Sequence, residues 1–478
     1  MIMKTYQDMQ AAIAPDGEGL EKFVTAAISE YVGSSEYRDI EVAYDYFCKK
    51  NRTIMQFQKW LQTLDRGPIP DLLSSNYKFR NAFFRVIVEQ EASYLLGEGV
   101  TFNSPDTKKA LGGDQFDARM REACEYALWG RCSYVFYNLD RIEVFKPLEF
   151  VPLYDEETGA LRAGIRFWQI DSKHNKRITL YQEDGYTDYI DVPGKDLEIR
   201  DPKRSYRVIV SRSQADGVTV SDGGNYVGFP IVPLWGNRTR TSELEGLREK
   251  IDGYDMIQSG LANTIDDASE LYWIIQNGSG MDDPDIARFF ERLRSLRAAV
   301  TDGPEQVTPH TIEIPFEARR YALENLRESI FRDAMALDMD KLSAGNATAT
   351  AIKASYENLD LKCDGLEMCV TDTVKSLLIL AGKPDDMPTY KRSKLINEQE
   401  QTAMVLSAKD YLDEETILKH LPFLSPDEIK DILKRKAAER EAAKQSETPD
   451  TSAYSADGSD RLVQPGESNS PPDGESDG

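Results

Sequence analysis

Adjacent carboxylates are the residues of this 478-residue chain that come closest to a catalytic arrangement. The pairs are Asp266-Asp267, Asp282-Asp283 and Asp385-Asp386. Carboxylates of this kind can hold the two metal ions of a nuclease. However, adjacent carboxylates on a helix diverge, no histidine lies near any pair, and only the last pair has a close lysine, Lys383. We therefore favour solvated helix ends over a metal-dependent nuclease.

The usual motifs of nucleotide binding, metal binding and nucleophilic catalysis are absent from the sequence. It has no Walker-type phosphate loop, no dinucleotide-binding glycine pattern after a strand, no H-E-x-x-H and no G-x-S-x-G. His174, His310 and His420 are isolated from each other and from the cysteines, and the five cysteines include no C-x-x-C pair. We therefore expect no catalytic residue, no metal site and no cofactor.

The composition indicates an acidic globular protein. Apolar residues make up 40% and charged residues 29% of the chain, which is typical of soluble proteins, and the length predicts two to four domains. Asp and Glu number 82 against 58 Lys and Arg, a formal charge of −24, which disfavours tight binding of nucleic acid. The same acidity suits a surface past which nucleic acid moves without sticking. The chain shows neither a signal peptide nor eighteen successive apolar residues, so we expect a cytoplasmic protein with no membrane partner.

The elements that would position functional residues begin with helices. Residues 1–95 are helix-rich, and the helical spacing of apolar residues predicts a helix from Asn76 to Leu96 with a buried aromatic face. Gly97-Glu98-Gly99 ends it, and a second helix is predicted over Gln115–Tyr126.

The apolar period then changes to two, which indicates an antiparallel sheet with hairpins. The predicted strands are 132–137, 142–145, 150–154, 163–170, 177–181, 186–190 and 206–210. The region ends at 228–237, where Pro230 and Pro233 keep the chain extended and away from the centre of a sheet.

A long helix is expected next, opening with a possible capping box at Ser242 and Glu245. One face is apolar, and the outward face carries acidic residues, namely Glu243, Glu245, Glu249, Asp252 and Asp255. A compact insertion follows, with a strand at 271–276, a turn at 278–280, a helix at 283–299 that starts near Pro284, and a strand at 306–314. The helices that flank the insertion must return side by side.

Residues 316–382 contain two helical patterns joined by a short polar stretch. The first pattern carries an apolar stripe of Leu323, Leu326, Ile330, Ala334 and Leu337, and the second carries Ile352, Tyr356, Leu359, Cys363, Leu366, Val370, Val374 and Leu377. The connection 338–350 is small and polar and indicates a mobile loop, either a simple hairpin or a contact for a partner of changing shape. Gly382-Lys383-Pro384 ends the second helix. Residues 398–445 predict a separate helical unit that restarts at Ser425-Pro426, and the acidic tail after it should be disordered.

The order of these parts resembles the portal proteins of tailed bacteriophages, of the siphophage type found in Gram-positive hosts. The resemblance covers about residues 40–440 and is carried by the order and spacing of three motifs. They are Tyr94-Leu-Leu-Gly-Glu-Gly-Val-Thr-Phe102, Gly228-Phe-Pro-Ile-Val-Pro-Leu-Trp-Gly-Asn237 and Ala351-Ile-Lys-Ala-Ser-Tyr-Glu-Asn-Leu359.

The resemblance implies an α+β portal fold with a helical N-terminal segment, an antiparallel β-rich wing and a two-helix stem. The implied parts are a wing at 1–241, stem helices at 242–268 and 316–337, a small α/β clip at 269–315, a tunnel loop at 338–350, a long wing helix and connection at 351–397, a helical crown at 398–445 and a disordered acidic tail at 446–478.

The resemblance also implies a function. Portal proteins form a ring of twelve subunits at one capsid vertex of the virion, through which double-stranded DNA is packaged and later released. The implied partners are the terminase large subunit, the head-completion or neck adaptor proteins, and the capsid and scaffolding proteins, met first in the host cytoplasm during assembly. A minor head protein or scaffold adaptor without a DNA channel is the alternative.

Three sets of residues follow as candidate sites. The DNA-facing tunnel loop comprises Asp340, Lys341, Leu342, Ser343, Ala344, Gly345, Asn346, Ala347 and Thr348. The candidates that face the channel from the stem are Glu245, Glu249, Asp252 and Asp255, whose like charge would lower adhesion of DNA. The partner-binding candidates of the clip are Asp283, Asp285, Arg288, Arg292 and Arg294, which equally suit a contact between subunits. Lys341 is either a weak phosphate contact or an ordinary solvated lysine.

Overall fold

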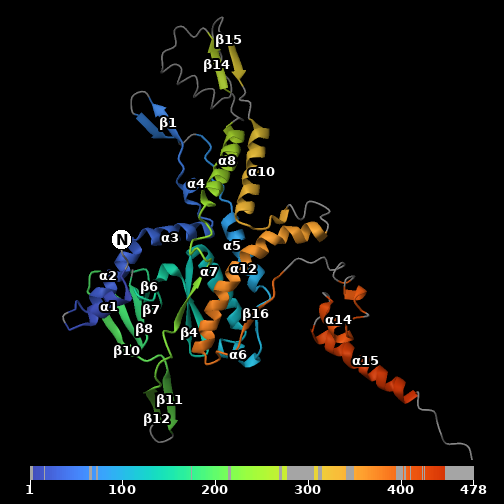
Figure 1. Cartoon of the computed structure of the whole chain (residues 1–478). Coiled ribbons are helices and arrows are strands. Elements are labelled where there is room, and N and C mark those ends of the chain that lie inside the picture. The colour runs from blue at the N-terminus through green and yellow to red at the C-terminus, as the bar shows by residue number, and fades with distance from the viewer. Residues whose placement is uncertain are drawn as a thin grey trace, which may run out of the picture. The chain divides into compact units, whose positions relative to one another are not determined.

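The computed structural model describes residues 4–15, 17–63, 67–71, 74–173, 175–213, 217–267, 272–276, 306–310, 315–340, 349–393, 402, 405–409, 411–421, 424 and 426–446. The chain divides into two compact units, Met1–Lys394 and Leu395–Gly478. Figure 1 draws both units.

The first unit starts with helices and a small hairpin. The elements are α1 (Tyr6–Ile13), α2 (Leu20–Gly33), α3 (Ser35–Phe47), α4 (Arg52–Gln56), β1 (Trp60–Thr63), β2 (Gly67–Pro70) and α5 (Phe83–Leu96). The helix predicted from Asn76 begins only at Phe83, so its first turns were predicted wrongly. Residues 76–82 instead run extended. Side chains of Asp255, Ser259 and Asn263 accept hydrogen bonds from the backbone N–H groups of this segment.

Two antiparallel sheets confirm the alternating pattern. After β3 (Val100–Phe102), α6 (Pro105–Ala110) and α7 (Gln115–Gly130), the strands are β4 (Cys132–Asn138), β5 (Arg141–Phe145), β6 (Phe150–Tyr154), β7 (Leu161–Gln169), β8 (Lys176–Gln182), β9 (Gly185–Asp191), β10 (Glu198–Arg204), β11 (Val208–Ser213), β12 (Gly217–Asp222) and β13 (Ile231–Trp235). The strand orders are β10-β9-β8-β7-β6 and β13-β4-β5, and β11 and β12 form a hairpin. β13 is an edge strand, as Pro233 predicts.

The helices of the second half follow β13. They are α8 (Arg248–Asp267), α10 (Phe316–Asp333) and α12 (Ala349–Leu380), and the strands β14 (Tyr272–Gln276) and β15 (Gln306–His310) pair between α8 and α10. The predicted capping box does not start α8, because the helix begins at Arg248 and Ser242 Oγ accepts from the N–H of Leu244 at 3.2 Å. The predicted turn at 278–280 and helix at 283–299 lie outside the described residues.

The main core lies between helices and the smaller sheet. Trp129 and Phe116 of α7, Val135 of β4, Leu95 of α5 and Val374 of α12 are all fully buried in it. A second core covers one face of the five-stranded sheet with α1 and α2. β16 (Pro388–Tyr390), which follows α12, pairs with β3, a contact between distant segments that no local pattern predicts.

The described residues of the second unit are largely helical, as predicted. Its principal elements are α14 (Glu414–His420) and α15 (Pro426–Ser446). The predicted tail beyond Ser446 lies outside the described residues. None of the helices in the described part of the chain is long and apolar enough to span a membrane.

Candidate functional site

α8 and α10 lie side by side and run in opposite directions (Figure 1). At one end of the pair, Lys250 forms an ion pair with Asp333. At the other end, Arg319 Nη1 donates to Thr264 Oγ1 at 2.9 Å and to the carbonyl oxygen of Gly260 at 3.3 Å. The prediction that the helices flanking the insertion return side by side is therefore confirmed.

An aromatic side chain of α5 joins the two helices. The ring of Phe83 meets Tyr254 of α8 at a centroid distance of 4.9 Å and Phe331 of α10 at 5.9 Å, both edge to face. Edge-to-face pairs add about 0.5–1.5 kcal/mol each beyond the area they bury. The pair of α8 and α10 is thus fixed to the main core near the end that carries Lys250 and Asp333.

A polar seam holds α8 against the extended segment 76–82. The side chains of α8 in this seam recur at helical spacing and are Asp252, Asp255, Ser259 and Asn263. Asn263 Oδ1 accepts from the N–H of Tyr77 at 2.6 Å, Ser259 Oγ accepts from the N–H of Phe79 at 2.9 Å, and Asp255 Oδ1 accepts from the N–H of Asn81 at 3.1 Å. The segment is not part of a sheet, so its backbone N–H groups need these acceptors.

This seam corrects the prediction for the acidic face of α8. Asp255 is 0% exposed, so the prediction that it faces a channel is wrong. Burial raises the pKa of its carboxyl, and hydrogen bonds from Asn81 and Asn51 oppose that rise. The side chain of Asp252 is only 16% exposed, and its carboxylate accepts from the hydroxyls of Tyr46 and Thr53.

The other two candidates of the stem are exposed. Glu245 and Glu249 line a surface pocket of about 240 Å³, together with Asp39, Arg131 and Arg248. Their predicted position on a channel wall stays a prediction, because it depends on how copies of the chain assemble.

The segment that follows α10 is anchored at three points. α10 ends at Asp333, and Met335 then takes a left-handed conformation with φ 53°. The helix was predicted to reach Leu337, but this residue lies in the turn that follows, where Gln90 of α5 holds it. The N–H of Leu337 donates to Gln90 Oε1 at 2.8 Å, and Gln90 Nε2 donates to the carbonyl oxygen of Leu337 at 3.2 Å.

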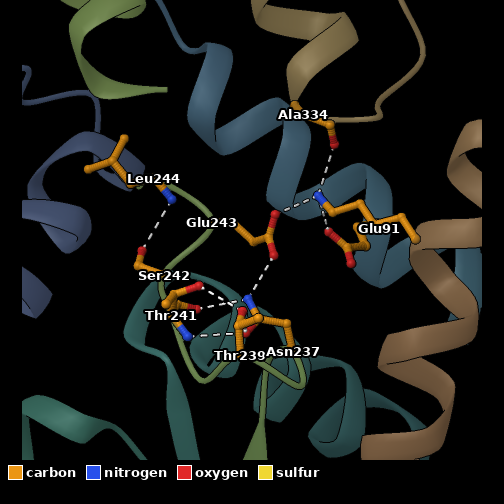
Figure 2. A network of polar contacts seen from close by, with 9 residues as sticks. Glu91, Asn237, Thr239, Thr241, Ser242, Glu243, Leu244 and Ala334 are labelled. Carbon is orange, nitrogen blue, oxygen red and sulfur yellow. Dashed lines mark hydrogen bonds and ion pairs between the residues drawn. The ribbon is translucent and has the colours of Figure 1, made fainter. Parts of the chain in front are cut away.

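The second anchor is an ion network around Lys362 of α12, and Figure 2 labels its partners Glu91, Glu243 and Ala334. Its ammonium lies 2.7 Å from Glu91 Oε2 of α5 and 2.7 Å from Glu243 Oε2, in the segment before α8. It also donates to the carbonyl oxygen of Ala334, just past the end of α10, at 3.0 Å. The side chains of Lys362 and Glu91 are only 12% and 3% exposed. One buried cation therefore joins four separate stretches of the chain.

Burial and charge perturb both partners of this network. Burial lowers the pKa of Lys362, but the two carboxylates outweigh it, and the pKa lies above its ordinary value. Burial raises the pKa of Glu91 to about 7, and Glu243 adds to this rise while Lys362 opposes it. Glu243 also accepts from Asn237 Nδ2 at 3.0 Å, and this amide organises the turn from 237 to 241 (Figure 2).

The third anchor is Arg327 of α10. Its guanidinium donates to both carboxylate oxygens of Asp338, at 2.7 and 3.0 Å, and also pairs with Asp340. Hydrogen bonding to Asp338 is the main cause of the raised pKa of Arg327. Bidentate pairs of this kind fix geometry as well as charge. Of the predicted tunnel-loop residues, Asp340 is therefore bound to the helix that precedes the loop.

The chain that follows the loop, in α12, packs against the same helix α5. α12 begins at Ala349, two residues earlier than predicted. Tyr356 stacks on Tyr94 of α5 at 5.6 Å, and both belong to a cluster that includes Leu337. Both ends of the connection thus pack around Tyr94. We call this cluster and the three anchors the loop base.

Several predicted residues lie outside the described residues. They are the loop residues Lys341, Leu342, Ser343, Ala344, Gly345, Asn346, Ala347 and Thr348 and the clip residues Asp283, Asp285, Arg288, Arg292 and Arg294. Their roles stay predictions.

The acidic pairs have structural partners where they are described. Asp386 accepts from the N–H of Asn103 at 3.0 Å and from Thr107 Oγ1 at 2.6 Å, next to the start of α6, and the hydrogen bond from Thr107 is the main cause of its lowered pKa. Asp266 accepts from Ser75. Within the described ranges, no three His, Cys, Asp or Glu side chains are grouped so that they could hold a metal ion.

The polar anchors of the loop base, Gln90, Arg327 and the pair of Lys362 with Glu91, were not predicted from the sequence. A signal was present, because Glu91 follows Ile87 and Val88 on the buried face of α5, and a charged residue on an apolar face normally has a buried partner. The partner itself lies far away in the sequence, and no local pattern points to Lys362.

Comparison with known proteins identifies the class. The sequence model of phage portal proteins of the SPP1 Gp6-like type matches residues 33–442. The chain therefore belongs to this family of phage portal proteins, and its function is that of a portal protein, the channel of the phage head at the capsid vertex. The resemblance inferred from the three motifs is confirmed.

Individual relatives agree with this assignment. The chain is 24% identical over 438 residues to the portal protein of Clostridium phage phiCD119, covering 85% of this chain and 93% of that protein. It is 23% identical over 391 residues to the portal protein of Bacillus phage SPP1, covering 75% of each. Both phages infect Gram-positive hosts, as predicted.

Two solved structures also match. One is described as the neck of a native gene transfer agent particle computed with C12 symmetry, with 12% identity, a TM-score of 0.37, and coverage of 71% of this chain and 88% of that chain. The other is the virion of a native gene transfer agent particle, with 14% identity, a TM-score of 0.33, and coverage of 73% and 87%.

Proposed function

We propose that the protein assembles into a ring of twelve subunits whose central channel passes double-stranded DNA into the head during packaging and out of it at release. Membership of the portal family over residues 33–442 carries this proposal. A closed ring of identical subunits also explains how copies of one chain can enclose a channel.

The parts of the chain take the following roles in this proposal. Residues 242–268 and 316–337 form the stem, 269–315 the clip, 338–350 the tunnel loop, and 398–445 the crown. Residues 1–241 and 351–397 form the wing. The antiparallel pair of α8 and α10 supports the assignment of the stem, because it carries the clip residues out from the core and returns the chain to the loop base.

The loop base supports a role of residues 340–348 beside the channel. Gln90, Lys362 and Arg327 hold the chain just before the loop, and Tyr94 packs against residues from both of its ends. A loop whose ends are fixed in this way keeps a defined position while its tip contacts a moving partner. Lys341 would then offer a phosphate contact that is weak and readily exchanged in salt.

The remaining partners follow from the same proposal. The terminase large subunit supplies the energy of packaging and docks on the clip, which neck or head-completion proteins occupy later. Capsid and scaffolding proteins surround the wing. Assembly takes place in the host cytoplasm, and the finished ring remains in the virion.

Electron microscopy and mass measurement of the purified full-length protein test the proposal. We expect rings with a central hole and a mass near twelve times the 54.0 kDa of the subunit. Particles that stay monomeric or dimeric at every salt concentration would contradict it. Rings of the expected mass without an axial hole would favour a scaffold or adaptor.

A further inference from the structure

α12 carries apolar side chains on the side opposite its buried stripe. Leu361, Met368 and Ile379 are 65%, 57% and 57% exposed. They are seven and eleven residues apart, close to two and three whole turns of a helix, so they lie on one face. The row extends over about 27 Å at 1.5 Å per residue. Isolated exposed apolar residues are ordinary, but an aligned row of three on one helix indicates a contact surface.

A glycine interrupts this face. Gly365 lies one turn after Leu361 and just under one turn before Met368, and a Cβ atom built on it would have no neighbour within 4 Å. Glycine in the middle of a helix costs about 1 kcal/mol relative to alanine. The packing of this chain on itself does not require the missing side chain. Close approach of another backbone would require it.

We propose that this outer face of α12, defined as Leu361, Gly365, Met368 and Ile379, packs against a second copy of the chain in the ring. The inference rests on the proposed function, because a closed ring joins two different surfaces of each subunit and must cover both. The outer face would form the apolar centre of one of these surfaces.

Charge favours a second copy over DNA as the occupant. Each copy has a formal charge of −24, so neighbouring copies repel one another and need contacts that are largely apolar. The outer face meets this need. Its nearest exposed charge toward the C-terminal end, one turn past Met368, is the carboxylate of Asp372, which repels phosphate. The face also carries half-buried Lys375, but beside Asp372 it has no net positive charge with which to hold a phosphate backbone.

Gly365→Ala separates an assembly role from a structural one. In the subunit, the added methyl meets open space and strengthens the helix, so hydrogen exchange in the middle of α12 should slow about fivefold. In the ring, the same methyl occupies the space that Gly365 leaves for the neighbouring subunit. The subunit concentration at which half of the protein is assembled should therefore rise at least tenfold. A merely structural glycine would not give opposite effects.

Leu361→Gln combined with Met368→Gln gives the second test. Mass photometry over a dilution series should show the same loss of rings, whereas the control Ile170→Gln, which alters an equally exposed side chain after β7, should assemble like the wild type. Variants that form rings at the wild-type concentration overturn the inference. Normal rings that fail to enter heads also overturn it, since the face would then bind a capsid protein. Failure of the wild type to form any ring contradicts the proposed function instead.

Discussion

Replacing Lys362 with methionine tests the loop base most directly. The substitution keeps most of the apolar volume of the side chain but removes the ammonium that pairs with Glu91 and Glu243 and donates to the carbonyl oxygen of Ala334. Glu91 then holds a buried carboxylate without a counter-charge. We expect the end of α10 and the middle of α12 to open more readily, while the rest of the first unit keeps its structure.

The magnitude follows from burial. Removing one partner of a buried ion pair costs about 3–5 kcal/mol. The side chain of Glu243 is 15% exposed and keeps its bond to Asn237, so we expect the lower value, about 3 kcal/mol, at pH 8.

The loss should depend on pH. The pKa of Glu91 is raised from 4.5 to about 7, so the folded state binds this proton more tightly than the unfolded chain, and ionisation of Glu91 lowers stability as the pH rises between these values. Without Lys362 the pKa rises further. The unfolded chain titrates alike in both proteins, so the difference between variant and wild type is smallest below pH 7, where both folded forms keep Glu91 protonated, and it grows as the pH rises above 7.

Hydrogen exchange measured by mass spectrometry suits this local effect, because a chain with two compact units need not unfold in one step. At pH 8 and a fixed protein concentration, peptides covering 330–337 and 359–366 of the variant should exchange about a hundredfold faster than those of the wild type. Lys391→Met is the control, since this side chain is 83% exposed and lies 3.8 Å from Glu98, and it should change exchange little.

A second variant checks the cause. Adding Glu91→Gln to Lys362→Met removes the unpaired charge and should restore most of the lost protection. Exchange within threefold of the wild type at pH 8, or an equal loss at pH 5 and pH 8, would refute the electrostatic account of the network.

The remaining predictions concern the polar seam, the sheet and the loop. Asp255→Ala should cost about 2 kcal/mol, because it leaves buried amide donors without an acceptor, while Glu245→Ala on the exposed side of the same region should be neutral; chemical denaturation compares them. Gly164→Ala should cost about 1–3 kcal/mol, since its Cβ would lie 2.0 Å from Phe150 Cζ, whereas Gly33→Ala meets no atom within 4 Å and should leave the melting temperature unchanged. Lys341→Ala should leave rings intact in electron micrographs but lower the amount of DNA packaged per head, and a failure to assemble would show that Lys341 is a packing residue instead.

Local patterns in the sequence were sufficient for much of the fold. The apolar stripe from Tyr356 to Leu377 is buried in α12 as predicted, and the stop at Gly382 is present with φ 71°. The alternating residues after Cys132 form antiparallel strands. Such features were predictable because helices and strands repeat within a few residues, so that burial of one face is visible in the order of residue types.

Whether a polar side chain is exposed or buried could not be predicted in the same way. Asp252 and Asp255 were expected on an outward acidic face, and with Ser259 and Asn263 they also recur at helical spacing. The structure buries most of this face against residues 77–81, which are more than 170 positions away in the sequence. A carboxylate on a helix looks the same in the sequence whether it meets water or a backbone N–H.

The sequence by itself determined the class of the protein, through the order of its parts, and the apolar faces of its main helices. Only the tertiary structure decided which charged groups are buried and what they join, as with Lys362, Glu91 and Arg327 around the loop base. The physical reason is that apolar burial follows a short period along the chain, whereas the partner of a buried charge is set by which distant segments meet, and sequence spacing carries no record of that distance.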